Sequence, residues 1–398
     1  MRNFLKKATA AVLVLALTLS LAGCYSEDKT WAAKKGDTTL PIGGYIYFLY
    51  NAYSEAASKV DSNTDVLSAK IEDKDAKDWI KENALEQLNS FYYIEDKFAE
   101  LGLELTDEEK ATADNNTSTM WTYYGSTFDA MGIAKTSFNM VYSLYSTKRN
   151  KVFEAMYNEG GERAIPEDEL KTHFVENFLS YSYFTAPLTK TDDEGNSSDL
   201  SDDDKKALKE KLEGYQKKID AGDTTVNDAA NEYAEETSTD STYSSPVSKK
   251  DSMNTTVLDA LNGMKDTETA VIEVGSTYYL IQKNSIEEQF STIMESDTDK
   301  LSLMSDLKGE DFTDFVKEQA KSIEGVELND KGLNSVNLNT LVNDNNKKGT
   351  SSAESSASSE SGTSSADSSE TSSEVSSSES EASSEVSSQV SSSESSAA

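Results

Sequence analysis

Apolar residues recur at helical spacing through the first part of the chain. The clearest case lies between residues 75 and 101, where charged side chains separate Trp79, Ala84, Leu88, Phe91, Ile94 and Phe98. Gly102 is expected to end this helix, and Thr106 with Glu109 matches the capping box that starts the next one. Similar patterns predict helices over 119–128 and 135–157. A short strand that leads into a helix is expected between Trp31 and Tyr53.

The pattern changes at Leu179. From there to Thr185 the chain is uncharged and rich in aromatic and hydroxyl residues, which predicts a strand. Two later strands, joined at Gly275–Ser276, predict a hairpin over 269–274 and 278–283. Between the first strand and this hairpin, the patterns predict helices over 202–220, 226–236 and 255–261. They also predict an acidic exposed loop over 189–204 and a polar loop over 237–252. With a helix over 167–177, these elements predict a small α/β unit at 165–288, inserted after a mainly helical segment at 31–164.

Helical patterns return after the insert, over 297–307 and 310–323, and a short strand is expected at 326–328. The pattern is lost from residue 338 onward. Residues 349–398 are almost entirely Ser, Glu, Ala, Thr and Gly, without Lys or Arg. Such a segment cannot bury enough apolar surface to fold, so we predict a disordered tail over 338–398. The predicted fold class is α+β.

The chain begins with a targeting segment. A basic start is followed by an apolar run from Ala8 to Leu21 that is too short to span a bilayer comfortably. The run ends in Leu21-Ala22-Gly23-Cys24, which resembles the bacterial lipobox. This resemblance implies a signal peptide at 1–23 and a diacylglyceryl group on Cys24, followed by a short tether at 24–30. The protein is then expected on the extracytoplasmic face of the cell membrane, anchored by its lipid; an ordinary signal peptide with a chance cysteine is the alternative.

Charge and composition exclude several classes of function. The net charge is -35, with 72 acidic against 37 basic residues, and such a surface repels nucleic acid. Cys24 is the only cysteine, so no disulfide can form within the chain. His173 is the only histidine, and no pattern of metal ligands or of a catalytic triad accompanies it. We therefore expect no metal and no cofactor.

The order of elements in the insert resembles the parvulin-type peptidyl-prolyl isomerase domain. Residues 179–185 lie over the family's first strand, which ends in aliphatic-x-small-x-His-Ile-Leu. The family's helix with its G-x-x-F-x-x-L-A-x-x-x-S stretch is resembled by residues 211–222 followed by 226–237. The family's last strand reads Gly-Tyr-His-Ile-Ile-Lys, and residues 277–282 resemble it. The flanking helices resemble the PrsA/SurA group of secreted foldases, over about 31–335. This implies that 289–337 completes the helical chaperone domain begun at 31–164, and that the partners are unfolded or nascent secreted polypeptides.

The insert departs from the parvulin pattern at its catalytic positions. Tyr183 and Tyr279 stand where the family carries histidines, and residues 242–246 replace the family's Gly-Asp-Leu-Gly segment. An isomerase must lower a rotation barrier of ~18–20 kcal/mol about the prolyl amide. Tyrosine can take part in a hydrogen-bond network, but it is larger than histidine and titrates near pH 10. We therefore expect weak or absent isomerase activity, with Tyr183 and Tyr279 as the catalytic positions if the activity persists.

Aromatic side chains in the first helical segment are candidates for client binding: Tyr45, Tyr47, Tyr50, Tyr92 and Tyr93. The alternative is that they fill a helical core, since a tyrosine ring can pack while its hydroxyl stays hydrated. The function that the sequence favours is a membrane-anchored foldase or chaperone. An active prolyl isomerase and a solute-binding lipoprotein remain as alternatives, although the second class usually has two α/β lobes rather than long flanking helices.

Overall fold

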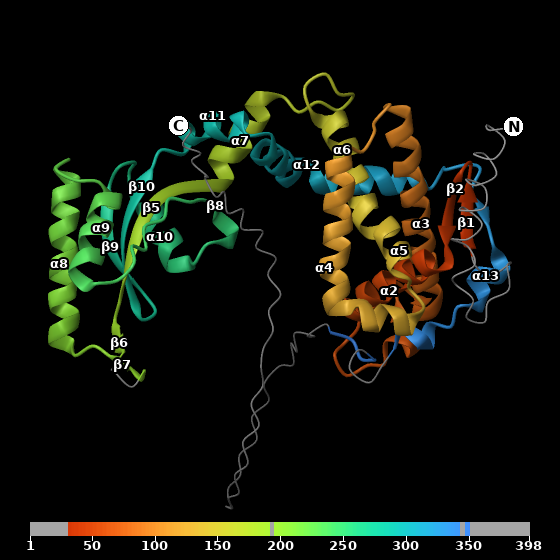
Figure 1. Ribbon diagram of the computed structural model, residues 1–398, viewed down its shortest axis with the longest axis horizontal. Coiled ribbons are helices and arrows are strands. Elements are labelled where there is room, and N and C mark those ends of the chain that lie inside the picture. Colours follow the sequence, from red (N-terminus) through yellow and green to blue (C-terminus); the bar gives the residue numbers. More distant parts are fainter. Residues whose placement is uncertain (1–30, 192–194, 343–346, 351–398) are drawn as a thin grey trace, which may run out of the picture. The chain divides into compact units, whose positions relative to one another are not determined.

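The computed structural model describes residues 31–191, 195–342 and 347–350. Cys24, with the rest of the predicted signal and tether, and the segment from residue 351 onward lie outside the described residues. The described part is an α+β fold in which long helices accompany small antiparallel sheets (Figure 1).

A hairpin and an aromatic helix open the described chain. The strands β1 (Trp31–Lys35) and β2 (Thr38–Pro41) pair across a turn at Gly36, whose φ of +55° favours glycine. The helix α2 (Ile42–Ser58) starts directly after Pro41. Short elements then lead to the next helix: η2 (Val66–Ser68), β3 (Lys70–Ile71) and β4 (Lys74–Asp75).

Two long helices follow, and the first confirms the helix that the periodicity predicted over 75–101. It is α3 (Ala76–Glu100), which packs along α2. The second, α4 (Asp107–Met131), begins with the predicted capping box. The Glu109 backbone N–H donates to Thr106 Oγ1 (3.1 Å), and the Thr106 backbone N–H donates to Glu109 Oε2 (2.6 Å).

Helical segments lead from α4 to the sheet. The helix α5 (Lys135–Phe138), a π-helical turn η3 (Asn139–Leu144) and α6 (Tyr145–Tyr157) follow one another without a break, and α7 (Glu167–Asn177) comes after a non-helical segment at 158–166. The π-helical turn is tied to α4 by polar side chains. Thr117 Oγ1 lies 2.7 Å from both Ser143 Oγ and Asn139 Oδ1, and Asn139 Nδ2 donates to Asp114 Oδ1 (2.8 Å).

The sheet that follows α7 has four strands in the order β8-β5-β10-β9, and all its neighbours are antiparallel. Its strands are β5 (Phe178–Pro187), β8 (Val247–Lys249), β9 (Thr269–Val274) and β10 (Thr277–Asn284). The helices beside it are α8 (Asp202–Asp220), α9 (Val226–Thr237) and α10 (Thr255–Gly263), with a single turn η4 (Lys250–Ser252) before α10. Strand alternation divides the core: Phe184 and Leu280 pack against α8 and α9, whereas Leu179 and Ile281 pack with α10. In Figure 1, α8 and α9 lie on one side of the sheet and α10 on the other.

Two predictions for this region are corrected. The segment expected to be an acidic loop at 189–204 forms the hairpin of β6 (Thr189–Thr191) and β7 (Ser197–Asp199) and the start of α8. The polar loop expected at 237–252 contains β8, at the edge of the sheet. An edge strand is held by backbone hydrogen bonds on one side and needs few apolar side chains, so polar sequences conceal it.

The last part of the described chain returns to the first helices. It contains α11 (Ile286–Glu295), α12 (Asp297–Ala320), β11 (Glu327–Leu328), α13 (Asp330–Ser335) and η5 (Leu338–Leu341). The helix α12 packs on α3 and α6, and β11 pairs with β1, where Leu328 lies opposite Ala33. One helix therefore replaces the two predicted on either side of residue 309. A glycine inside a helix costs only about 1 kcal/mol, which the burial of Met304 and Phe312 outweighs.

The predicted start of the tail at residue 338 is wrong. Leu338 and Leu341 are buried in the core formed around α2 and α3. The Thr350 backbone N–H also donates to the Ala57 carbonyl (2.7 Å). Two leucines in a polar sequence are too few to show a periodic pattern, and this explains why the sequence did not reveal them.

Across the described residues, every helix is too short or too polar to traverse a lipid bilayer.

Candidate functional site

Tyr183 and Tyr279 lie on the same face of the sheet, on the two central strands. Tyr183 is opposite Ile281 and Tyr279 is opposite Thr185, so the two tyrosines are diagonal neighbours across β5 and β10. Their ring centroids are 5.4 Å apart, and the ring planes are inclined by 37°. Both side chains are half-buried.

A third tyrosine extends this pair into a row. Tyr181 stacks on Tyr183, with centroids 5.7 Å apart and an angle of 22° between the rings. Burial raises the pKa of the Tyr181 hydroxyl, and a hydrogen bond with Ser248 partly offsets the effect. Tyr181 and Tyr183 pack with the apolar cluster under α10. Tyr181, Tyr183 and Tyr279 thus form a row of aromatic rings on one face of the sheet.

The segment before β8 continues the pairing along β5. The Tyr183 backbone N–H donates to the Ser244 carbonyl (2.8 Å), and the Ser244 N–H donates to the Tyr183 carbonyl (2.9 Å). The Thr185 N–H donates to Thr242 Oγ1 (2.8 Å). Residues 242–246 thus serve as an irregular edge strand that fixes the backbone of Tyr183 from the side opposite β10.

The tyrosines predicted to bind clients lie mainly inside the helical core. Tyr45 and Tyr92 are 3% and 1% exposed and offer no surface to a client, which corrects the prediction for these two. Tyr47 is 9% exposed and packs against Phe138 and Phe128. Tyr50 and Tyr93 are half-buried, against Phe128 and Phe315 respectively. The most exposed aromatic pair of the described helices is instead Tyr123 (74%) with Tyr124 (48%) on α4.

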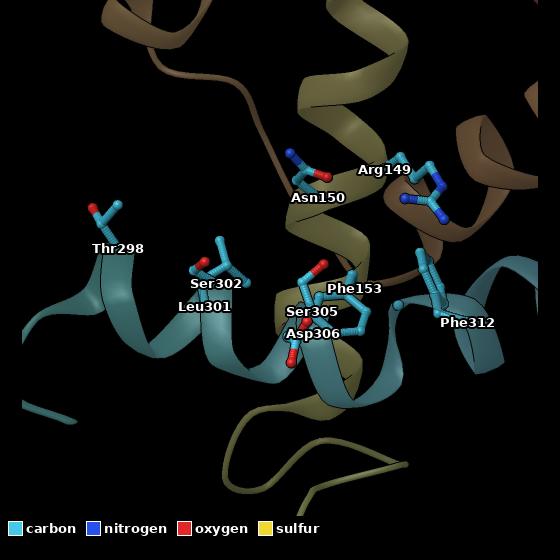
Figure 2. Close-up of a pocket in the computed structure, with 10 residues that line it drawn as sticks. Arg149, Asn150, Phe153, Thr298, Leu301, Ser302, Ser305, Asp306 and Phe312 are labelled. Carbon is cyan, nitrogen blue, oxygen red and sulfur yellow. The ribbon is translucent and has the colours of Figure 1, made fainter. Parts of the chain in front are cut away.

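A cavity of about 560 Å³ lies in the corner between α6 and α12 (Figure 2). Figure 2 shows Arg149 and Asn150 on α6 and the hydroxyls of Ser302 and Ser305 on α12 directed into this corner. The apolar part of the lining comes from Phe153, Leu301 and Phe312. Hydrogen-bonding groups and apolar side chains therefore line the same cavity.

A second cavity of about 530 Å³ adjoins the first on the α4 side. Asn150 and Leu301 line both cavities, so the two form one groove along α6, called here the α6 groove. An ion pair between Lys151 Nζ and Glu109 Oε1 (2.8 Å) joins α6 to α4 at its edge. The hydrogen bond from Lys151 is the main reason why the pKa of Glu109 lies below its usual range. A hydrogen bond from the Thr106 backbone N–H lowers this pKa further.

The carboxylate of Asp306, at the end of the α6 groove, is already occupied. His173 Nε2 and Lys249 Nζ each lie 2.7 Å from one of its oxygens. Burial alone would raise the pKa of Asp306, but the hydrogen bonds with Lys249 and His173 outweigh burial and hold it below the usual range. The only histidine of the chain thus has a charged partner on α12. Within the described ranges, no three His, Cys, Asp or Glu side chains come together as a metal site requires.

No protein-family model and no curated protein matches this chain. Solved structures that are similar to it include foldase protein PrsA from Streptococcus pneumoniae str. Canada MDR_19A and PrsA from Bacillus subtilis. The first is 14% identical and covers 65% of this chain and 89% of that chain, with a TM-score of 0.35. The second is 15% identical and covers 71% of this chain and 98% of that chain, with a TM-score of 0.31. Similarity this low does not by itself say what the chain does.

Sequence reasoning missed the residues of the α6 groove. Asn150, Ser302 and Ser305 are ordinary polar positions on helices that lie about 150 residues apart, and only packing of α12 against α6 brings them together. The sequence offers one weak signal, which is the low charge of residues 301–305 within an otherwise charged helix.

Proposed function

We propose that this chain is a membrane-anchored extracytoplasmic foldase or chaperone, and that unfolded secreted polypeptides bind in the α6 groove. The observation that carries the proposal is the mixed lining of that groove. An unfolded segment presents backbone amides and apolar side chains together. Asn150, Ser302 and Ser305 can exchange hydrogen bonds with the amides, while the half-buried Leu301 contacts apolar groups. Such a lining favours no particular client sequence.

The sheet with its helices would act as a second arm, without efficient prolyl isomerase activity. Its strand order and its tyrosine row support this part of the proposal. Tyr183 and Tyr279 fill the space between them with ring contacts, which leaves an apolar platform rather than a polar catalytic pocket.

The location rests on the sequence at the N-terminus. Cys24 follows small residues at the end of the apolar run and would carry the lipid that keeps the protein where exported chains emerge. Labelling with a radioactive fatty acid, compared between the natural chain and Cys24→Ser, tests the anchor directly.

Suppression of aggregation tests the groove. The form that starts at Tyr25 is mixed with a denatured client on dilution, and light scattering is followed. We expect suppression at stoichiometric ratios, and a severalfold loss of it in Ser302→Trp, since the indole fills the α6 groove. The matched control is Ser322→Trp, at an exposed serine after α12. If the natural chain does not suppress aggregation at stoichiometric excess, the proposal is overturned. If Ser302→Trp and Ser322→Trp suppress aggregation equally well, clients do not bind in the α6 groove.

A further inference from the structure

A third cavity of about 290 Å³ lies among α2, α3, η3, α6 and α12 and adjoins the α6 groove, with which it shares Arg149 and Tyr142. Two cationic side chains line it, Arg149 and Lys317, and none of the described lining residues is acidic. The chain has 72 acidic and 37 basic residues, so an acid-free cavity with two cations contrasts with the rest of the molecule. We call it the Arg149 cavity.

The guanidinium of Arg149 is positioned without a carboxylate partner. Its Nη2 donates to Thr313 Oγ1 (2.6 Å), and its plane lies over the Phe312 ring, 4.9 Å from the centroid. Among the described residues, it forms no ion pair. A guanidinium carries five N–H donors in one plane, so most of them are available to an anion.

Lys317 adds a second positive charge at the same cavity. It lies one helical turn after Thr313 on α12 and is exposed, and no described carboxylate pairs with its ammonium group. Attraction from two cations strengthens the binding of an anion between them, and it weakens as salt is added.

The remainder of the lining is largely aromatic. Tyr47 and Tyr142 meet edge to face, with ring centroids 6.1 Å apart, and Tyr145 lies beside them. Burial raises the pKa of both Tyr47 and Tyr145 to about 12, so their hydroxyls stay protonated at neutral pH and can donate hydrogen bonds. The π-helical turn η3 supplies Tyr142, which lines both this cavity and the α6 groove.

We propose that the Arg149 cavity binds a carboxylate that carries an aromatic or branched apolar group. Arg149 and Lys317 hold the carboxylate, and the tyrosine rings contact the apolar group. This chemistry belongs to the C-terminal residue of a polypeptide and also to small aryl-substituted acids. The volume suits one such residue rather than a longer segment. Arg149 and Tyr142 line both the Arg149 cavity and the α6 groove, whereas Lys317 lines only the Arg149 cavity. Lys317→Gln therefore distinguishes a failure of this inference from a failure of the proposed chaperone function.

Matched peptides test the proposal with the chain from Tyr25 onward. A labelled pentapeptide that ends in phenylalanine is titrated by fluorescence polarisation, once with a free C-terminal carboxylate and once amidated. We expect the free acid to bind at least about tenfold more tightly, as the loss of a charge-assisted hydrogen bond predicts. N-acetylphenylalanine as a competitor distinguishes the two kinds of carboxylate. If it displaces the peptide, small aryl-substituted acids are ligands as well; if it does not, the site is restricted to polypeptide C-termini. Equal affinity of the two peptides, or binding of neither, would overturn the proposal.

Variants locate the binding. Lys317→Gln removes an exposed charge without disturbing a packed side chain, and it should weaken binding of the free-acid peptide severalfold. Arg149→Gln should weaken it further, although this variant also loses contacts with Phe312 and Thr313. Lys321→Gln is the control, since it removes the same charge from the end of α12, where Lys321 pairs with Glu318 instead of lining the cavity. An equal effect of Lys317→Gln and Lys321→Gln would show a general field effect and contradict the site.

Discussion

Tyr183 and Tyr279 contact each other across the two central strands of the sheet, 5.4 Å between ring centroids. Under the proposed function, these two rings pack against each other instead of lining a polar catalytic pocket. We therefore predict that the chain accelerates cis–trans isomerisation of a proline peptide weakly or not at all. A protease-coupled assay with a chromogenic proline peptide, run with the chain from Tyr25 onward, measures the rate.

Truncation of either tyrosine should lower the stability of the fold. Tyr279→Ala is expected to lower the free energy of unfolding by about 0.5–1.5 kcal/mol for the lost ring contact, in addition to the lost buried area. Tyr279→Phe keeps the ring and serves as the control. For the isomerase prediction, the contradicting result would be efficient catalysis by the natural chain that disappears in Tyr183→Ala and Tyr279→Ala. That result would assign catalysis to this pair.

The capping box at the start of α4 gives a further prediction about stability. Thr106→Ala removes the oxygen that accepts the Glu109 N–H, and it should lower the free energy of unfolding by about 1 kcal/mol. Thr112→Ala, at an exposed position inside the same helix, is the control, and we expect no loss there because alanine is the better helix former. Urea unfolding followed by circular dichroism compares the three chains.

The same cap predicts a pH dependence. Hydrogen bonds from Lys151 and from the Thr106 N–H hold the pKa of Glu109 below its usual range in the folded state. Its contribution is therefore fully present above the unfolded-state pKa, and it is lost as the pH falls through the lower folded-state value. The difference in stability between the natural chain and Glu109→Gln should be largest near neutral pH and vanish in acid. A difference that grows on acidification would contradict this assignment.

Local signals in the sequence predicted the regular elements well. The helix expected over 202–220 has those bounds in the structure, and the capping box at Thr106 is present. Both depend on residues close in sequence. The edge strand β8 and the continuity of α12 through Gly309 depend on partners far along the chain, and no local pattern encodes them.

The candidate site was less accessible to sequence reasoning than the fold. Tyr45 and Tyr50 occupy the same aromatic run, yet one is buried and the other half-buried, because only packing decides which face of α2 meets α3. Tyr183 and Tyr279 lie side by side because of the register between β5 and β10. The sequence singled out both residues only through the resemblance of their strands to those of the parvulin family. The groove residues Asn150 and Ser302 carry no comparable signal.

The buried leucines after α13 give a last prediction. Leu341 is fully buried in the core around α2, and Leu341→Ala should lower the free energy of unfolding by about 2–5 kcal/mol. Leu328→Ala is the matched control, because Leu328 is 39% exposed and its loss should change stability by no more than about 0.5 kcal/mol. Thermal and urea unfolding measure both variants. Equal effects of the two substitutions would mean that the packed region ends before residue 338, as the sequence had indicated.

The pairing of Ala33 with Leu328 has a consequence for the order in which the chain folds. The partners β1 and β11 are about 290 residues apart in sequence, so one edge of β1 stays open until the C-terminal part of the described chain is in place. The strands β5, β8, β9 and β10 find all their partners between residues 178 and 284 and can assemble without that part. A chain truncated before residue 327 would hold a finished sheet beside an open strand edge, which is a template for aggregation.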